Sequence, residues 1–188
     1  LQPLPEPAAT GNEILFIGTM GYSPNRDAAR YFCREIFPLI LEKIPGCVLN
    51  LVGAGGKEHL ADLEVPGIVN VTGRVKTPLP WYQRSRLAVV PLRSGGGSRL
   101  KILEAMALGK PVIGARTGGI PEQIDHERTG LLFTMGDSRM LTRQMAELKD
   151  NPEACVELGR AARAKLEKEY SLEMHCNELL RIYNEVLH

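Results

Sequence analysis

Short apolar runs alternate along the chain with longer stretches in which apolar residues recur at every third or fourth position. Each run is about the length of a strand, and several runs end in Gly or Pro. The runs cover residues 14–18, 48–53, 68–72, 87–91, 111–115 and 130–133. Strands that alternate with helices form a parallel sheet with helices on both faces. The pattern therefore predicts an α/β fold with a Rossmann-like sheet of about six strands.

The stretches between the runs predict helices. The clearest one spans residues 25–44, with Pro24 near its start and a bend expected at Pro38. The other helices are predicted over residues 99–108, 137–149 and 151–170 and from a cap at Ser171 to the end of the chain. The chain from residue 137 onward is thus expected to be helical, with no further strand.

The first eleven residues differ from the rest because they hold three prolines and little else of structural character. We interpret residues 1–11 as an interdomain linker and residues 12–188 as one domain. A disordered terminus is the alternative. The segment has neither a basic start nor an apolar core, so it is not a signal peptide.

The charges are nearly balanced, with 23 basic and 22 acidic residues and a net charge of +1, which argues against a dedicated nucleic-acid-binding protein. No run approaches the ~18 apolar residues that a membrane span needs. The four cysteines form no Cys-x-x-Cys pair and do not cluster with the histidines. We interpret them as reduced thiols of a cytoplasmic protein that has no zinc site.

The segment over residues 93–111 is the most informative part of the chain because it follows a predicted strand and opens a helix. In open α/β sheets, ligands bind at the carboxyl ends of the strands. Three consecutive glycines in this segment let the backbone approach a ligand closely. The helix N-terminus behind them favours a phosphate.

Two cations are expected in the first turn of this helix, since Arg99 and Lys101 follow the predicted cap Ser98. Cations there oppose the helix dipole, at a cost of a few tenths of a kcal/mol each. A bound diphosphate would turn that cost into attraction, so we predict that both side chains face one. The alternative is that they extend into solvent.

Glu104 lies among apolar residues of the same helix. A rigidly held carboxylate accepts hydrogen bonds well from two adjacent hydroxyls, such as a ribose diol. The alternative is a solvated helix residue.

Residues 104–124 resemble the C-terminal domain of the group 1, or family 4, retaining glycosyltransferases. Further matches lie at residues 16–20, 51–55, 71–75 and 130–133, so that the resemblance extends from about residue 13 to the final helix. It implies one half of a GT-B architecture, in which two Rossmann-like domains face each other across a cleft. The N-terminal domain, which takes the acceptor, is expected to be absent here, and this domain is expected to bind the nucleoside diphosphate sugar.

The resemblance also implies roles for single residues. In this family the second glutamate of an E-x7-E motif binds the donor ribose, and Glu104 matches it. The first glutamate would fall at Gly96, which is a departure from the family pattern. The chain is similar to a subgroup with a Gly-Gly-Gly-x-Arg-x-Lys pattern. In such a pattern the diphosphate contacts would come from the residues Gly96, Gly97, Ser98, Arg99 and Lys101.

Other contacts follow by the same resemblance. Gly18 and Thr19, at the end of the first strand, are expected to approach the diphosphate through their backbone. Gly73, Arg74 and Val75 match a loop that holds the base, largely through main-chain groups. The Arg and Lys pair that the family has after the first strand is not cleanly present, and no catalytic residue is assigned.

The sequence leaves three functions open. The first is the donor-binding domain of a retaining glycosyltransferase, which we expect to need no metal because the chain has no Asp-x-Asp motif. The others are a non-catalytic nucleotide-sugar-binding module and a sugar-nucleotide epimerase of GT-B type. A dinucleotide-binding site is disfavoured because the fingerprint that starts at Gly53 has Glu58 in place of its third glycine.

Overall fold

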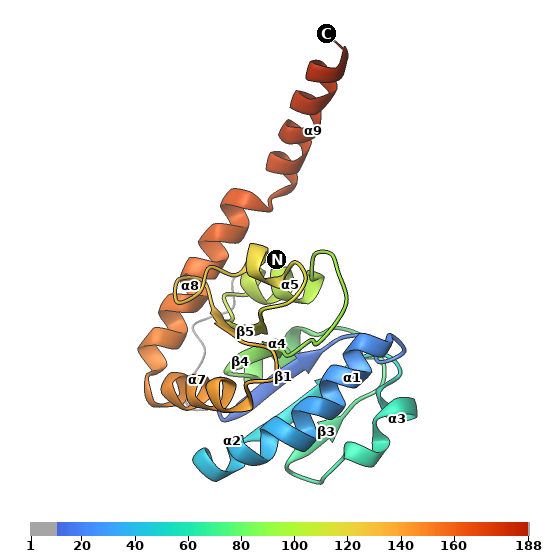
Figure 1. The fold of residues 1–188 in the computed structure, drawn as a ribbon, viewed down its shortest axis with the longest axis vertical. Helices are drawn as coiled ribbons and strands as arrows, with labels where there is room; N and C mark the ends of the chain where they lie inside the picture. Colours follow the sequence, from blue (N-terminus) through green and yellow to red (C-terminus); the bar gives the residue numbers. More distant parts are fainter. Residues whose placement is uncertain (1–10, 188) are drawn as a thin grey trace.

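The computed structural model describes residues 11–187, so the predicted linker lies outside the described residues except for Gly11. Six parallel strands form one sheet in the order β3-β2-β1-β4-β5-β6 (Figure 1). The strands are β1 (Glu13–Ile17), β2 (Val48–Val52), β3 (Val69–Val71), β4 (Leu87–Val90), β5 (Val112–Ala115) and β6 (Leu131–Phe133). This order, which reverses between β1 and β4, confirms the predicted Rossmann-like α/β fold.

Helices connect the strands and cover both faces of the sheet (Figure 1). Those before β4 are α1 (Ser23–Tyr31), the π-helical η1 (Phe32–Ile36), α2 (Phe37–Lys43), α3 (Gly56–His59), the 3-10 helix η2 (Ala61–Leu63) and α4 (Leu79–Arg84). Those after β4 are α5 (Leu100–Ala107), α6 (Ile120–Gln123), α7 (Ser138–Asp150), α8 (Pro152–Glu169) and α9 (Leu172–Leu187). Along the covering layers, η1 and α2 pack against α7, and α5 packs against α8.

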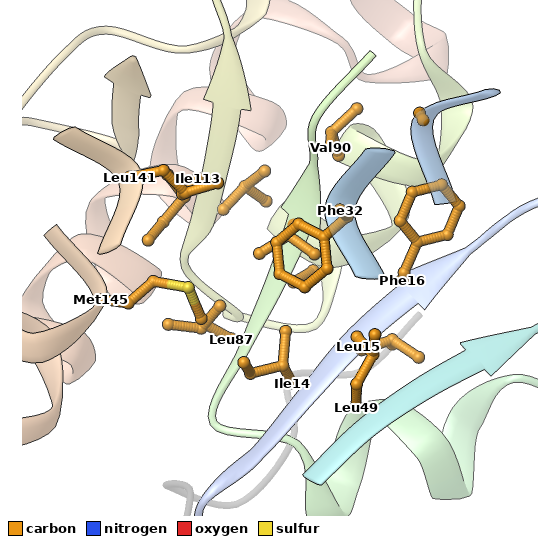
Figure 2. Packing of buried hydrophobic residues seen from close by; sticks show 14 of the residues in the cluster. Ile14, Leu15, Phe16, Phe32, Leu49, Leu87, Val90, Ile113, Leu141 and Met145 are labelled. Atoms are coloured by element: carbon orange, nitrogen blue, oxygen red, sulfur yellow. The ribbon is translucent and has the colours of Figure 1, made fainter. Parts of the chain in front are cut away.

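The core lies between the central strands and these helices. Leu15 and Phe16 of β1 and Leu49 of β2 are fully buried, and Phe32 of η1 packs into the same cluster (Figure 2). Because helices cover both faces, successive residues of a central strand are buried whichever face they point to, which explains the continuous apolar runs in the sequence.

The first long helix is interrupted near Pro38, as predicted. The backbone N–H of Phe37 donates to the carbonyl of Phe32, five residues back, instead of four. Proline has no N–H and its ring crowds the preceding turn, so the helix widens there into a π-helical segment rather than continuing regularly. The two α-helical parts, α1 and α2, still pack as one layer.

The C-terminal helices begin close to the predicted positions, and each has a side-chain cap at its start. Asp137, Asn151 and Ser171 each accept a hydrogen bond from the backbone N–H three residues ahead, at 2.8, 3.0 and 3.2 Å. Such caps satisfy N–H groups that have no partner within the helix. They fix the starts of α7, α8 and α9.

The last helix, α9, extends away from the sheet and its covering helices (Figure 1). Its exposed apolar residues are Met174, Leu179, Leu180, Ile182, Tyr183, Val186 and Leu187. In the part of the chain that the structure describes, no helix is long and apolar enough to cross a membrane.

Candidate functional site

A cleft of about 570 Å³ opens at the carboxyl ends of β1 and β4, where the strand order reverses. Ligands of open α/β sheets bind at such a switch point, because the loops after the two strands diverge there. The predicted site residues that line this cleft are Gly18, Thr19, Arg74, Val75, Ser98, Arg99, Lys101 and Glu104. The lining does not include Gly73, Gly96 or Gly97. The fold thus brings together residues that are up to 86 positions apart, from Gly18 to Glu104.

Lys101 reaches from α5 to the end of β1. Its ammonium donates to the side-chain carbonyl of Asn25 at 2.8 Å and lies 5.4 Å from the centre of the Phe16 ring. Burial, and then the neighbouring Arg99 guanidinium, lower the pKa of Lys101 to about 8, although the Glu104 carboxylate acts in the opposite direction. A half-buried cation with so few anionic neighbours is well suited to an anionic ligand.

Arg99 corrects the expected start of the helix. The sequence indicated Ser98 as the cap, but α5 begins at Leu100, and Arg99 itself occupies the N-cap position with an extended backbone. No side-chain cap bond forms there, and Ser98 is exposed. The helix starts one residue later because the buried Arg99 backbone is held by another side chain, Gln123.

The Arg99 side chain is also more enclosed than expected, with 9% of its surface exposed. Its guanidinium donates to the backbone carbonyl of Gly95, and its buried Nε has no hydrogen-bond partner. Arg99 therefore stabilises the glycine-rich loop through its bond to Gly95. It also contributes positive charge to the wall of the cleft.

The glycine-rich loop rests on a second glycine turn. A Cβ atom on Gly118 would lie 2.6 Å from the carbonyl oxygen of Gly95, and one on Gly119 would lie 3.0 Å from that of Gly97. Gly118 also has φ = +52°, which L side chains rarely adopt. Side chains at these positions would push the two turns apart, so both glycines shape the loop beside the cleft.

Glu104 lies one helical turn after Lys101 and is half-buried. Its carboxylate accepts a hydrogen bond of 3.4 Å from the hydroxyl of Tyr82, which also donates to the Lys101 carbonyl at 3.3 Å. Burial, and then the Glu104 carboxylate, raise the pKa of Tyr82 well above its usual range, so the phenol remains a donor. The carboxylate keeps further acceptor capacity toward the cleft.

The end of the cleft near β3 is formed by the segment that follows this strand. Arg74 is exposed, Val75 is half-buried, and both line the cleft together with Pro78 of the following loop. Gly73 lies just behind them and is half-buried. Val75 and Pro78 thus give this wall an apolar part, and Arg74 adds a cation.

Some residues of the cleft were not predicted as site residues. Asn25 and Tyr22 line it from the start of α1, and Leu100 lines it with 72% of its surface exposed. In the sequence, Asn25 stood out only as the first residue of the helix predicted over residues 25–44. Its role depends on the distance to Lys101, which no local pattern reveals.

The glycines after β2 have a packing role. A Cβ atom on Gly53 would lie 2.0 Å from the carbonyl oxygen of Gly18, and one on Gly56 would lie 1.9 Å from that of Thr72. Neighbouring loops approach each other too closely here for a side chain. The close packing of these loops therefore explains both glycines without a bound dinucleotide.

The basic residue after the first strand, Arg26, has a scaffolding role. Its guanidinium donates to the carbonyls of Met20 and Gly21 at 3.2 and 2.7 Å, and so it braces the loop between β1 and α1. It does not line the cleft. In the described residues the cations of the cleft are instead Arg74, Arg99 and Lys101.

No group of three or more His, Cys, Asp or Glu side chains that could hold a metal ion occurs among residues 11–187 with described side chains. The four cysteines are free. His126 accepts a hydrogen bond of 3.1 Å from the backbone N–H of Leu132 through Nδ1, and so it stabilises the turn before β6.

Residues 11–151 match the family described as glycosyl transferases group 1. The chain therefore belongs to the group 1 glycosyltransferases. It is 29% identical to the trehalose synthase of Pyrococcus horikoshii over 166 residues, which cover 81% of this chain and 40% of that protein. It is 31% identical to the sulfoquinovosyl transferase of Arabidopsis thaliana over 140 residues, which cover 71% of this chain and 27% of that protein. The chain thus spans less than half the length of these relatives.

Several solved structures share this fold. The structure of TarM aligns with a TM-score of 0.80 and 22% identity over 97% of this chain and 37% of that chain. Anabaena HepE, solved in complex with UDP, aligns with a TM-score of 0.76 and 18% identity over 93% of this chain and 49% of that chain. The C-terminal domain of the group 1 protein LpcC from Francisella tularensis aligns with a TM-score of 0.65 and 17% identity over 85% of this chain and 86% of that one. These likenesses support the predicted GT-B class of fold.

Proposed function

We propose that this chain is the donor-binding domain of a retaining glycosyltransferase that moves a sugar from a nucleoside diphosphate sugar to a hydroxyl acceptor. One observation supports this most strongly: Lys101 and Glu104 face the same cleft from α5, at the switch point of the sheet. A cation and a carboxylate one helical turn apart suit the two ends of a ribose diphosphate. The complexes of Anabaena HepE with UDP and with UDP-glucose are consistent with such a ligand.

In this proposal the Glu104 carboxylate accepts hydrogen bonds from the two ribose hydroxyls. A carboxylate has two oxygens and about four lone-pair sites, and Tyr82 uses one of them through a long bond of 3.4 Å. The remaining sites are sufficient for a diol. The base then lies toward Arg74 and Val75, where Gly73 offers main-chain groups.

The diphosphate lies between the end of β1 and the start of α5. Lys101 supplies positive charge from α5, and Gly18 and Thr19 line the cleft at the end of β1. Arg99, which is bonded to the Gly95 carbonyl of the glycine-rich loop, adds further positive charge. Backbone amides for the outer phosphate come from the exposed residues Gly96, Gly97 and Ser98.

The chemical task of this domain is to stabilise the negative charge that develops on the departing diphosphate. Cations and amides held in place before the reaction do this without reorganisation, which is usually the largest contribution of an enzyme site. We assign no nucleophile or general base to this chain. Transfer is expected to need no divalent metal and therefore to withstand a chelator.

The acceptor is proposed to bind to a separate N-terminal domain of the same protein. The uncovered apolar residues of α9 support this, because such a helix face is usually covered by a partner surface. The greater length of the relatives also supports it. Activity, acceptor and sugar therefore belong to the whole protein rather than to this domain.

The two alternative functions make different demands on the cleft. An epimerase needs acid and base groups beside the sugar, whereas Glu104 is the one Asp, Glu or His among the described residues that line the cleft. A non-catalytic binding module would keep the same contacts but would show no transfer even with the acceptor domain attached.

The proposal is tested by calorimetric titration of the chain with UDP, GDP and ADP and with the corresponding nucleosides. One nucleoside diphosphate should bind, and Arg99→Glu and Lys101→Glu should each weaken it far more than the nucleoside. Binding should weaken with salt, because the attraction is partly between charges. The exposed Lys168→Glu is the control, and equal losses for diphosphate and nucleoside would contradict the proposal.

A further inference from the structure

Asn25 connects the first strand of the sheet to the helix that bears Lys101. The residue is 7% exposed, its amide Nδ2 donates to the carbonyl of Thr19 at 2.9 Å, and its Oδ1 accepts from the Lys101 ammonium at 2.8 Å. Both bonds fix the orientation of the amide. Rotating it by half a turn would set its NH₂ group against an ammonium and its oxygen against a carbonyl.

The site of the ammonium is narrow. A Cβ atom on Gly18 would lie 2.8 Å from the Lys101 ammonium and 2.8 Å from Nδ2 of Asn25, so only glycine leaves room for this pair. The ring of Phe16, which has no charge, also lies near the ammonium, with its centre 5.4 Å away. The ammonium is thus confined to a position at the end of β1, facing the cleft.

The charged and titratable groups around this position come from α4, from α5 and from the residue before α5. Arg99, which precedes α5, opposes the positive charge of Lys101, and Glu104 on α5 favours it. On α4, the hydroxyl of Tyr82 donates to the Lys101 backbone carbonyl. The remaining neighbour, Asn25 on α1, is uncharged. The ammonium of Lys101 is therefore held by a neutral acceptor, the amide oxygen of Asn25. A carboxylate at this position would be a stronger partner for it.

A neutral acceptor has a specific consequence. A carboxylate at position 25 would bind the ammonium more tightly, but it would also cancel its charge and repel a bound anion. An apolar side chain would leave the buried ammonium without an acceptor and favour its neutral form. An amide stabilises the charged form of Lys101 and leaves that charge available to a ligand.

We propose that Asn25 is a positioning residue that holds the Lys101 ammonium, in its charged form, against the diphosphate of a bound nucleotide. The inference rests on the proposed function, since it requires the diphosphate to lie beside Lys101. It adds that Asn25 of α1 sets the affinity for the diphosphate by maintaining the charge of Lys101 on α5.

The test uses two variants of similar volume, Asn25→Asp and Asn25→Leu. The pKa of Lys101 is measured by NMR in chain labelled at the lysine ε-carbon, in which the Lys101→Met variant identifies the signal. In the parent the pKa lies at about 8. It should rise by about one to three units in Asn25→Asp, as beside a close opposite charge, and it should fall below the parent value in Asn25→Leu.

The affinity for a nucleoside diphosphate is then measured from about pH 7 to about pH 10, the range between burial-shifted and ordinary lysine values. Parent binding should weaken as the pH passes the Lys101 pKa, and the midpoint of Asn25→Leu should lie at lower pH. Asn25→Asp should bind about tenfold or more weakly at neutral pH, because a charge-assisted contact is lost. The nucleoside is the control for titration of the base and should bind all variants alike.

Opposite shifts of the midpoint by the two variants cannot come from general damage to the fold. If Asn25→Leu does not fold, Asn25→Ala replaces it with the same expected direction. If Lys101→Met lowers the affinity but the Asp variant leaves the Lys101 pKa and the affinity at parent values, this inference is wrong and the proposed function stands. If Lys101→Met binds the diphosphate like the parent, the proposed function itself is wrong.

Discussion

Gln123 holds the backbone of Arg99 from both sides: its Oε1 accepts from the Arg99 N–H at 2.9 Å and its Nε2 donates to the Arg99 carbonyl at 3.4 Å. Gln123 is 2% exposed and lies in α6, whereas Arg99 precedes α5. The contact fixes the point at which the glycine-rich loop ends and the helix begins. It explains why α5 starts without a side-chain cap.

Replacing Gln123 by Leu should leave the buried N–H of Arg99 without a partner. The free energy of unfolding should fall by about 1–3 kcal/mol, the usual cost of a buried unsatisfied group. Because the loop beside the diphosphate would also lose its anchor, diphosphate affinity should fall more than nucleoside affinity in calorimetry.

A matched control for this prediction is Gln144→Leu. Gln144 is also buried, and its Nε2 donates to the carbonyl of Leu132 at 3.1 Å, but it does not line the cleft. Its variant should lose stability while the ratio of diphosphate to nucleoside affinity stays at the parent value. If Gln123→Leu also kept the parent ratio of diphosphate to nucleoside affinity, Gln123 would not anchor the glycine-rich loop.

Glu104→Ala should weaken binding of a nucleoside diphosphate by about 1–3 kcal/mol, the range for hydrogen bonds to charged groups. Glu104→Gln should recover part of the loss, because an amide oxygen still accepts but its NH₂ group does not. A 2′,3′-dideoxy nucleotide should bind parent and Glu104→Ala alike. Glu147→Ala, which removes an exposed carboxylate on α7, is the control. Parent-like affinity of Glu104→Ala would exclude the ribose contact.

Lys110 predicts an unusual dependence of stability on pH. Its ammonium is buried and donates to the carbonyls of Ser85 and Gln83 at 2.7 and 3.4 Å. Burial lowers the pKa of Lys110 to about 8, from 10.5 in the unfolded chain. Above pH 8 the folded chain therefore binds fewer protons than the unfolded chain, so the free energy of unfolding should rise with pH.

The rise from Lys110 should be at most about 1 kcal/mol per pH unit. Burial raises the pKa of Cys33 and Cys47 to about 12, from 9.0 in the unfolded chain, and these thiols act in the opposite direction at higher pH. Urea unfolding between about pH 8 and pH 9 is thus the informative window. Lys110→Met should show a smaller rise than the parent, and Lys168→Met should not. If the free energy of unfolding rises equally with pH in the parent, Lys110→Met and Lys168→Met, Lys110 does not titrate as stated.

The chain alone should show no glycosyl transfer, with or without a divalent metal. Much of the rate of such a reaction comes from placing the acceptor hydroxyl beside the anomeric carbon, and one lobe cannot place it. A radiolabelled donor assay with mixed acceptors measures this. Transfer at the level of a complete enzyme would overturn the two-domain proposal.

The sequence was sufficient for the strands and the long helices, but not for the short helices α3, α4 and α6 or for the loops. The apolar runs gave all six strands because burial on both faces leaves a local signal, and Asp137 and Asn151 marked helix starts because a cap acts within one turn. Ser98 looked like such a cap for the same local reason. Ser98 does not cap the helix because Gln123 accepts a hydrogen bond from the backbone N–H of Arg99. Gln123 is 25 residues from Ser98, so a local sequence pattern cannot reveal this contact.

The same limit applies to the cleft. Glu104, Arg99 and Lys101 were found because they follow a glycine-rich segment at a strand end, and this arrangement is readable in one stretch of sequence. Asn25 was missed as a site residue because its importance lies in a contact across 76 positions, to Lys101. Pairwise contacts of this kind follow from the packing of α1 against the sheet, which the periodicity does not specify.

The central claim is that a nucleoside diphosphate binds at the switch point of the sheet, and an NMR titration of the ¹⁵N-labelled chain tests it most directly. With the nucleoside diphosphate that binds most tightly, the amides of Gly18, Thr19, Val75 and Lys101 should shift together and saturate with one affinity. The amides around the second hollow, which Arg128, Asn151 and Leu158 line, should not move. Shifts that gather at that second hollow, or none at saturating ligand, would contradict the account.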